Sequence, residues 1–176
     1  MIKRVTSLIL ATVVLLMILS GCSDKEQSIK EAVLSGAEVT VNAGERVAVP
    51  VTLSNMNSLR EFCNGRLAGF QFNVSVTGLN VIGAETNLSN VNGMTNWTVD
   101  DSAQSDGSHM IMIMDMNLVG IESSGNVEIA QLYLEAPADA SGEYTVNYTV
   151  TDVCDTDANS AITDKITVQP SKVIVE

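Results

Sequence analysis

Apolar and polar residues alternate along most of the chain beyond its first twenty residues, with the two-residue period of β-strands. In the segment 67–76 the apolar members of the alternation share one side and the polar members share the other: Phe70, Phe72, Val74 and Val76 oppose Gln71, Asn73 and Ser75. The segment 46–53 repeats this pattern, and its Pro50 indicates an edge strand or a bulge. A strand with one apolar face must bury that face against a second layer, so the pattern predicts two packed sheets.

Further short segments of strand character follow at turn-rich intervals, and no helical pattern of comparable strength accompanies them. We expect strands at 38–42, 46–53, 67–76, 79–85, 109–116, 127–136, 144–153, 162–168 and 173–175, with a brief one near 97–99. Because the chain shows no internal repeat, this spacing predicts an all-β fold, a jelly-roll β-sandwich of about nine strands in two antiparallel sheets.

The N-terminal segment predicts a lipoprotein signal peptide over residues 1–21. Two basic residues precede an apolar run at 8–19, which is too short for a comfortable membrane span. Residues 19–22, Leu-Ser-Gly-Cys, resemble the lipobox of prokaryotic lipoproteins. The resemblance implies that Cys22 is acylated and becomes the mature N-terminus.

A lipid at Cys22 predicts an extracytoplasmic protein that is anchored to the cell envelope, in the outer membrane if the host has one. Residues 22–36 are rich in charged and polar side chains, which predicts a lipid-anchored tether. Residues 37–176 are long enough for one domain with a proper core. We expect the protein to contact the membrane through its N-terminal lipid only.

Acidic residues outnumber basic ones by 21 to 9, which gives the chain of 176 residues a net charge of −12. A surface of this sign repels phosphate backbones, so we do not expect a nucleic acid as partner.

Two cysteines remain when Cys22 is set aside, Cys63 and Cys154. In an oxidising compartment an even pair predicts a disulfide, which would stabilise the domain by about 4 to 5 kcal/mol in the chain-entropy model. Two buried free thiols are the alternative. Neither cysteine has a histidine nearby in sequence, so neither suggests catalysis.

The order of segments after the tether resembles the cohesin domain family. The resemblance rests on the Gly turn and Val-rich strand at 43–51, Ala-Gly-Phe-Gln-Phe at 68–72, Gly-Leu-Asn-Val at 78–81, the apolar strand ending in Met116-Asn117, and the strands at 127–134, 142–146 and 172–175. Cohesins are jelly-roll sandwiches that bind Ca²⁺-loaded dockerin modules of other proteins. The resemblance therefore implies a module that holds a dockerin-type protein ligand at the cell surface; a carbohydrate-binding or adhesive envelope module is the alternative.

The binding face of the family is a sheet that includes the strands matching 67–76 and 109–116. In the second segment four methionines, Met110, Met112, Met114 and Met116, share one side, and Ile111, Ile113 and Asp115 share the other. An ungapped match turns the methionines outward, and the partner-binding face would then contain Gln71, Asn73, Met112, Met114 and Met116. The opposite orientation packs the methionines in the core, and a copper-binding methionine ladder is a third option.

Three residues near the C-terminus, Asp155, Asp157 and Asn159, have the spacing of the first calcium ligands of an EF-hand loop. The sixth position of this loop is Ser160 instead of Gly, and the twelfth is Ile166 instead of Glu. These residues are therefore weak calcium candidates beside a solvated turn, and the sequence predicts no firm metal site or cofactor.

The residues do not predict an enzyme. The single histidine, His109, opens a strand, and the acidic residues are scattered over loops without a paired arrangement. A polysaccharide-binding module would need exposed aromatic platforms, and Trp97 is the candidate for this role. Aromatic residues make up 4% of the chain, which favours a protein partner over a polysaccharide.

Overall fold

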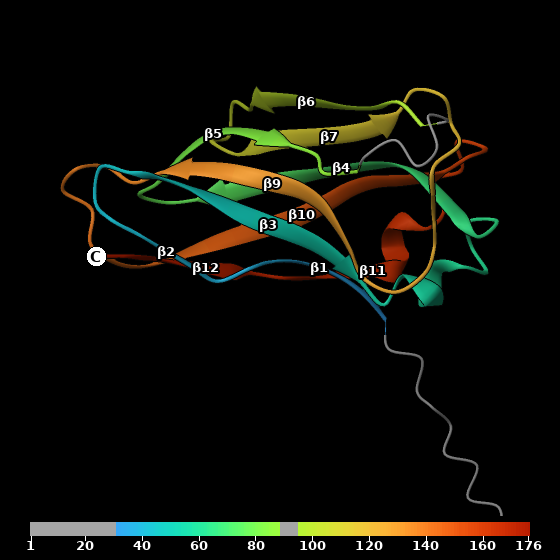
Figure 1. Cartoon of the computed structure of the whole chain (residues 1–176), viewed down its shortest axis with the longest axis horizontal. Coiled ribbons are helices and arrows are strands. Elements are labelled where there is room, and N and C mark those ends of the chain that lie inside the picture. Colours follow the sequence, from blue (N-terminus) through green and yellow to red (C-terminus); the bar gives the residue numbers. More distant parts are fainter. Residues whose placement is uncertain (1–30, 89–94) are drawn as a thin grey trace, which may run out of the picture.

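The computed structural model describes residues 31–88 and 95–176, which fold into two β-sheets packed face to face (Figure 1). Within these residues, sheet A has the strand order β11-β1-β3-β9-β5. Its strands are β1 (Ala32–Gly36), β3 (Arg46–Ser54), β5 (Asn80–Glu85), β9 (Val127–Glu135) and β11 (Ile166–Gln169). The predicted Cys22 and the signal peptide lie outside the described residues.

Sheet B has the order β2-β12-β10-β4-β7-β6, and the short β8 pairs with the start of β4. Its strands are β2 (Val39–Val41), β4 (Arg66–Val76), β6 (Trp97–Ala103), β7 (His109–Asp115), β8 (Ile121–Glu122), β10 (Gly142–Asp155) and β12 (Ser171–Val175). In the part of the chain that the structure describes, two 3-10 helices, η1 (Met56–Leu59) and η3 (Thr163–Lys165), lie in connections between strands. No helix among the described residues is long and apolar enough to cross a membrane.

The chain closes one side of the sandwich by passing from one sheet to the other twice. Strand β1 pairs with β3 in sheet A, and the next strand, β2, pairs with β12 in sheet B. Near the C-terminus β11 pairs with β1, and β12 continues in sheet B. The pairings β1–β11 and β2–β12 are parallel, whereas the other strand pairs described are antiparallel.

The folded domain begins earlier than the sequence analysis predicted. Residues 32–36, expected in the tether, form β1, because Ala32 and Leu34 point into the core and are almost completely buried. Residues 162–165, expected in a strand, form a turn and η3 instead. Pro50 lies in a central strand, and the register of β3 against β9 shifts just after it, between Val51 and Thr52.

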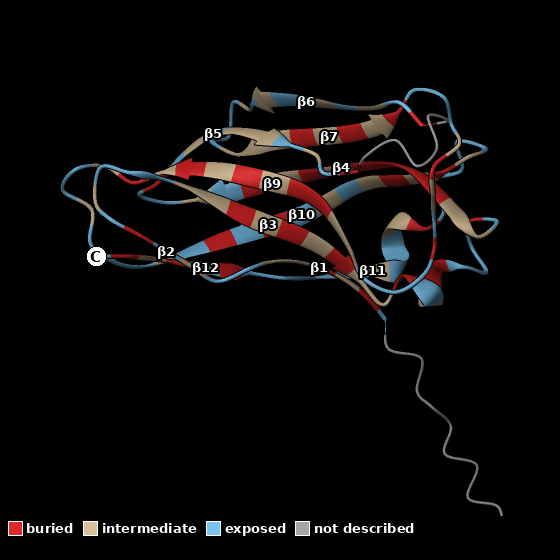
Figure 2. Cartoon of the chain, viewed as in Figure 1, coloured by how far each residue is buried: buried red, intermediate tan, exposed pale blue. Residues whose placement is uncertain are grey.

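The core lies between the two sheets and follows the predicted alternation (Figure 2). Sheet A contributes Val49, Val51 and Leu53, which are at most 1% exposed. Sheet B contributes Phe70, Phe72 and Val74 from β4. Burial of each such side chain stabilises the fold by roughly 1.5–3 kcal/mol. The opposite faces of both sheets remain open to solvent, and they are the surfaces on which a ligand can bind.

Candidate functional site

The outer face of sheet B carries three methionines side by side with polar residues of β4. In the strand register Met110 lies opposite Asn73, Met112 opposite Gln71, and Met114 opposite Gly69. Ile111 and Ile113 of the same strand are fully buried, whereas the three methionines are partly exposed. The methionines therefore face solvent, and the alternative that placed them in the core is wrong. We call Gln71, Asn73, Met110, Met112 and Met114 the methionine face.

Pairing with β4 explains this orientation. Phe70 lies opposite Ile113 and Phe72 opposite Ile111, so each isoleucine enters the core beside an aromatic ring. A shift of the register by one residue would turn every side chain of β7 over. The large apolar volume on the isoleucine side thus decides which residues of β7 remain available to a ligand.

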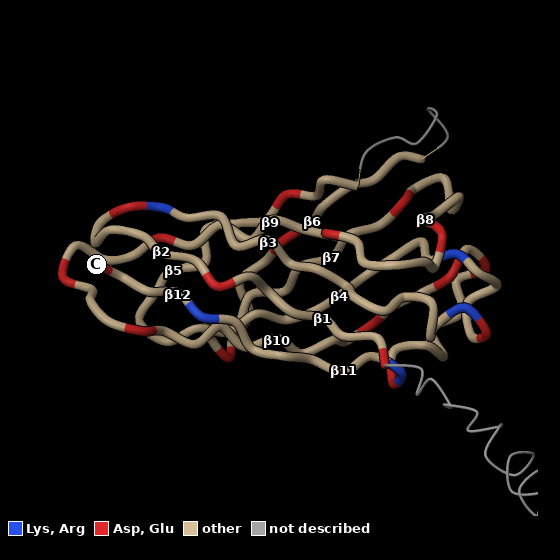
Figure 3. Tube along the Cα trace, turned by 60° about the horizontal axis from the view of Figure 1, so that its bottom comes forward, with Lys and Arg blue, Asp and Glu red and all other residues tan. Residues whose placement is uncertain are grey.

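The neighbouring strands extend the methionine face with small polar side chains. Strand β6 places Asp100 opposite Met112 and Thr98 opposite Met114. On the other side, the amide of Gln71 donates a hydrogen bond to Thr151 Oγ1 of β10 at 3.0 Å. Charged residues gather mainly in loops and near strand ends, and acidic ones predominate (Figure 3).

The loop after β7 is fixed by the buried carboxylate of Asp115. One of its oxygens accepts hydrogen bonds from the backbone N–H groups of Asn96 and Asn117, and the other from those of Val119 and Gly120, all at 2.6–3.1 Å. Burial disfavours the charged carboxylate, but these four donors outweigh it and lower the pKa of Asp115. The sequence pattern alone does not reveal this role of Asp115, since the donors come from two separate segments.

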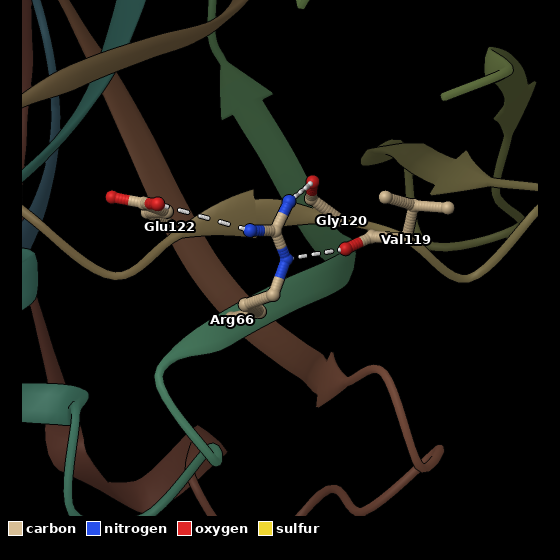
Figure 4. A network of polar contacts seen from close by, with 4 residues as sticks. All are labelled: Arg66, Val119, Gly120 and Glu122. Atoms are coloured by element: carbon tan, nitrogen blue, oxygen red, sulfur yellow. Dashed lines mark hydrogen bonds and ion pairs between the residues drawn. The ribbon is translucent and has the colours of Figure 1, made fainter. Parts of the chain in front are cut away.

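Arg66 fixes the same loop from the side of β4 (Figure 4). Its Nε donates to the carbonyl of Val119 at 2.6 Å, and one terminal nitrogen donates to the carbonyl of Gly120 at 2.7 Å. The other terminal nitrogen lies 3.9 Å from a carboxylate oxygen of Glu122. The restrained loop presents Met116 and Leu118, whose exposed fractions are 59% and 44%. Leu118 also has a φ of 54°, a left-handed conformation that is costly for a leucine.

Met116, predicted in the partner-binding face, thus lies just beyond β7, at the end of the methionine face. Met110, which the prediction did not include, belongs to that face through its pairing with Asn73. Its position could have been inferred from the alternation, because it shares the side of Met112.

The two cysteines are free thiols in this structure, so the predicted disulfide is not formed. Cys63 is fully buried in the core, whereas Cys154 is partly exposed on β10. The sulfur of Cys154 occupies the space above Gly69, 2.7 Å from where a Cβ on that glycine would lie. Burial, followed by the charges of Asp152 and Asp155, raises the pKa of the Cys154 thiol, which disfavours the reactive thiolate.

The weak calcium candidates form a closed turn. Asp155 is buried, and its Oδ1 accepts hydrogen bonds from the backbone N–H groups of Asp157 and Asn159, both at 2.9 Å. Asp157 Oδ2 accepts a hydrogen bond from the Asn64 amide, and Asn159 Oδ1 accepts one from the N–H of Ala161. Across residues 31–88 and 95–176, no three His, Cys, Asp or Glu side chains gather as a metal site. The side-chain oxygens of all three candidates thus accept hydrogen bonds within the loop or from Asn64.

Trp97 is not a free stacking platform in this structure. Its ring packs against Phe70, with ring centroids 6.1 Å apart and planes inclined by 23°, and it is only partly exposed. It lies opposite the buried Asp115 and therefore belongs to the inner side of β6. The sequence predicted a brief strand near residues 97–99, and the structure extends it to Trp97–Ala103 as β6.

Solved structures with the same fold are cohesins. The chain matches the cohesin CaCohA2 of Clostridium acetobutylicum, solved in complex with a dockerin, with a TM-score of 0.62 and 18% identity over 82% of this chain and 99% of that one. It matches the sixth cohesin of scaffoldin B from Acetivibrio cellulolyticus, in complex with a Cel5 dockerin mutant, with a TM-score of 0.62 and 20% identity over 84% of this chain and 100% of that one.

A third match is a non-cellulosomal cohesin of the archaeon Archaeoglobus fulgidus, with a TM-score of 0.60 and 13% identity over 84% of this chain and 92% of that one. No model of a protein family matches the sequence, and no curated protein matches it. The described domain therefore has the cohesin fold, which confirms the predicted sandwich and the resemblance on which it rested.

Proposed function

We propose that this protein is a lipid-anchored binding module that holds a protein ligand of dockerin type at the cell surface. The observation that carries the proposal is the methionine face, a row of partly exposed thioethers on a regular sheet. Two of the matched cohesins were solved together with dockerins, and their fold supports the same class of partner here.

The chemistry of the methionine face suits a protein partner. Methionine side chains are unbranched and polarizable, so they adapt to an irregular apolar surface without a large loss of contact. Gln71 and Asn73 lie directly beside them and offer amide groups that can both donate and accept hydrogen bonds. An apolar centre with polar groups at its border is the usual composition of a protein interface.

Lipid attachment at Cys22 would keep the domain close to the membrane. Nine residues, 23–31, separate Cys22 from the start of β1, and a fully extended chain of this length spans about 30 Å. The proposed module would therefore present its ligand within a few nanometres of the cell envelope. Labelling with a radioactive fatty acid, abolished by Cys22→Ser, is the expected result for this part of the proposal.

The binding part of the proposal is tested with the chain from residue 22, carrying Cys22→Ser and immobilised on a resin. The host's secreted and envelope proteins are passed over it with Ca²⁺ or with a chelator. We expect retention of a defined protein that the chelator releases, because dockerins are loaded with Ca²⁺.

Charge placed on the methionine face should weaken this retention. We expect Met112→Lys and Met114→Lys each to reduce the retained amount about tenfold or more, since a buried unpaired ammonium is costly at an interface. Thr52→Lys, on the outer side of sheet A, is the matched control and should retain the ligand fully. Equal retention by all three variants would show that the ligand binds elsewhere.

A further inference from the structure

The outer face of sheet A carries an aromatic side chain surrounded by small residues. In the strand register, Tyr133 of β9 lies opposite Ala48 of β3 and opposite Gly83 of β5. Neither neighbour has a side chain long enough to cover the tyrosine ring. A shallow hollow of about 440 Å³ results, and it is lined by Arg46, Val47, Ala48, Ile82 and Tyr133.

A bulge in β5 completes the hollow. The register of β5 against β9 shifts between Val81 and Gly83, so that the intervening Ile82 has no partner in β9. Ile82 is 38% exposed, unusual for an isoleucine within a sheet, and it adds an apolar border beside Tyr133.

Polar contacts lie at both ends of the hollow, and those at one end hold the ring. The Tyr133 hydroxyl donates a hydrogen bond to Glu85 Oε2 at 3.0 Å, and Gln131 Oε1 lies 3.4 Å from it. At the other end, Arg46 Nε donates to Glu135 Oε1 at 3.1 Å. The hydroxyl is thus bonded to side chains of the same sheet face, which restrains the ring instead of leaving it free to rotate into solvent.

We propose that this hollow, defined by Arg46, Ala48, Ile82 and Tyr133, binds the pyranose ring of a neutral saccharide. The C–H groups on one face of a pyranose are apolar and match a tyrosine ring in size. Its hydroxyls both donate and accept hydrogen bonds. The lining offers a guanidinium donor at Arg46, and the carboxylates of Glu135 and Glu85 are bonded to Arg46 and Tyr133. An aromatic surface with a few fixed polar groups is a typical small-ligand site.

The charges select a neutral saccharide over an acidic one. Two residues that line the hollow are each bonded to a glutamate, Tyr133 to Glu85 and Arg46 to Glu135, and the whole chain carries a net charge of −12. A uronic acid would place its carboxylate among these groups and be repelled.

This site is independent of the proposed protein-binding function. The hollow lies on the outer side of sheet A and the methionine face on the outer side of sheet B, with the core between them. The two ligands could therefore be bound at the same time, and a failure of one proposal leaves the other unaffected. The aromatic platform is Tyr133, in place of the predicted Trp97.

The test uses the chain from residue 22 with Cys22→Ser, labelled with ¹⁵N. Four hexasaccharides are titrated to millimolar concentration: those of β-1,4-glucose, β-1,4-xylose, N-acetylglucosamine and galacturonic acid. We expect at least one neutral hexasaccharide to shift the amide resonances of Ala48, Ile82 and Tyr133 and to leave that of Met112 in place. The galacturonic acid hexamer should cause no such shift.

Substitutions then identify the group that binds. Tyr133→Ala should lower the affinity at least tenfold, whereas Tyr133→Phe keeps the ring and should stay within about threefold. Ala48→Glu fills the hollow with a charged side chain and should abolish binding. Met112→Lys is the matched control on the opposite sheet and should bind like the parent chain, with thermal unfolding confirming that each variant folds.

The proposal is overturned if no neutral hexasaccharide shifts the three amides, or if the shifts map to another surface. It is also overturned if Tyr133→Ala or Ala48→Glu, both folded, binds like the parent chain. Stronger binding of the galacturonic acid hexamer would contradict the charge selection.

Discussion

The two outer faces of the sandwich are built from different side chains and suit ligands of different size. On sheet B, Met110, Met112 and Met114 form a row of flexible apolar side chains. On sheet A, the ring of Tyr133 lies between two small neighbours, Ala48 and Gly83, and a hydrogen bond from its hydroxyl to Glu85 restrains it. A row of adaptable groups can follow the surface of a protein, whereas one restrained ring fits a small rigid ligand.

The comparison shows how one architecture can present two kinds of site. Both faces obey the same two-residue alternation, and in each the inner residues are fixed by the core. The outer residues are free of that constraint, so their chemistry can differ while the fold is kept. Substitutions can test whether the methionine face is an outer surface, and which contacts fix the side chains of each face.

The largest expected effect is the difference in stability between substitutions on the inner and outer sides of β7. Ile111→Ala should lower the free energy of unfolding by about 3–4 kcal/mol, because it leaves a cavity beside Phe72 in the core. Met112→Ala, one residue further on, should lower it by less than about 1 kcal/mol, because its side chain faces solvent. Urea unfolding of both variants is the measurement. Similar losses for the two variants would contradict the orientation of the methionine face.

A smaller loss of stability is expected from a substitution of Asp115, which fixes the loop after β7. Asp115→Asn replaces one carboxylate oxygen with an amide that donates, so two backbone N–H groups lose their acceptor. We expect a loss of about 2–3 kcal/mol in the free energy of unfolding at pH 7. Asp100→Asn, an exposed change on β6, is the control and should stay within about 0.5 kcal/mol.

The lowered pKa of Asp115 predicts that the stability of the fold depends on pH. The pKa of Asp115 is lowered below 3.8 in the folded protein, so its charged form stabilises the fold at any pH above the ordinary value. This contribution is lost as the pH falls through the folded pKa. The parent chain should therefore lose stability more steeply below pH 4 than Asp115→Asn does. Parallel curves for the two proteins would show that Asp115 is not a major source of acid sensitivity.

The alternation of apolar and polar residues predicted the sheets. It could not predict the contacts between distant residues that fix the loop after β7 and shape the hollow at Tyr133. The two-residue spacing alone predicted a buried side for Phe70, Phe72 and Val74. Asp115 could not be recognised in this way, because its donors come from residue 96 and from the loop that follows it. Tyr133 was missed for a similar reason: its small neighbours, Ala48 and Gly83, are distant in sequence and meet it only through the register.

Gly69 keeps the methionine face flat beside Met114. Gly69→Ala should lower the free energy of unfolding by about 1–2 kcal/mol, since its Cβ would meet the sulfur of Cys154. The same substitution in a Cys154→Ala background should cost less than about 0.5 kcal/mol, because the sulfur is gone and alanine is no worse than glycine in a strand. Unfolding of the four proteins gives the coupling between the two sites. An equal cost in both backgrounds would mean that another contact limits the size of residue 69.

The smallest effect concerns the hydrogen bond that restrains Tyr133. The pKa of this tyrosine is raised above 10 by its hydrogen bond to Glu85, then by burial and by the charge of Glu85. Glu85→Gln removes the charge and weakens the bond, so the pKa of Tyr133 should fall towards its ordinary value. An ultraviolet titration between pH 9 and 12, with Tyr133→Phe to assign the signal, measures this shift. Tyr148 is the internal control, because burial raises its pKa independently of Glu85. If Tyr133 titrates unchanged in Glu85→Gln, then Glu85 does not restrain the ring, and the rigid platform on sheet A loses its support.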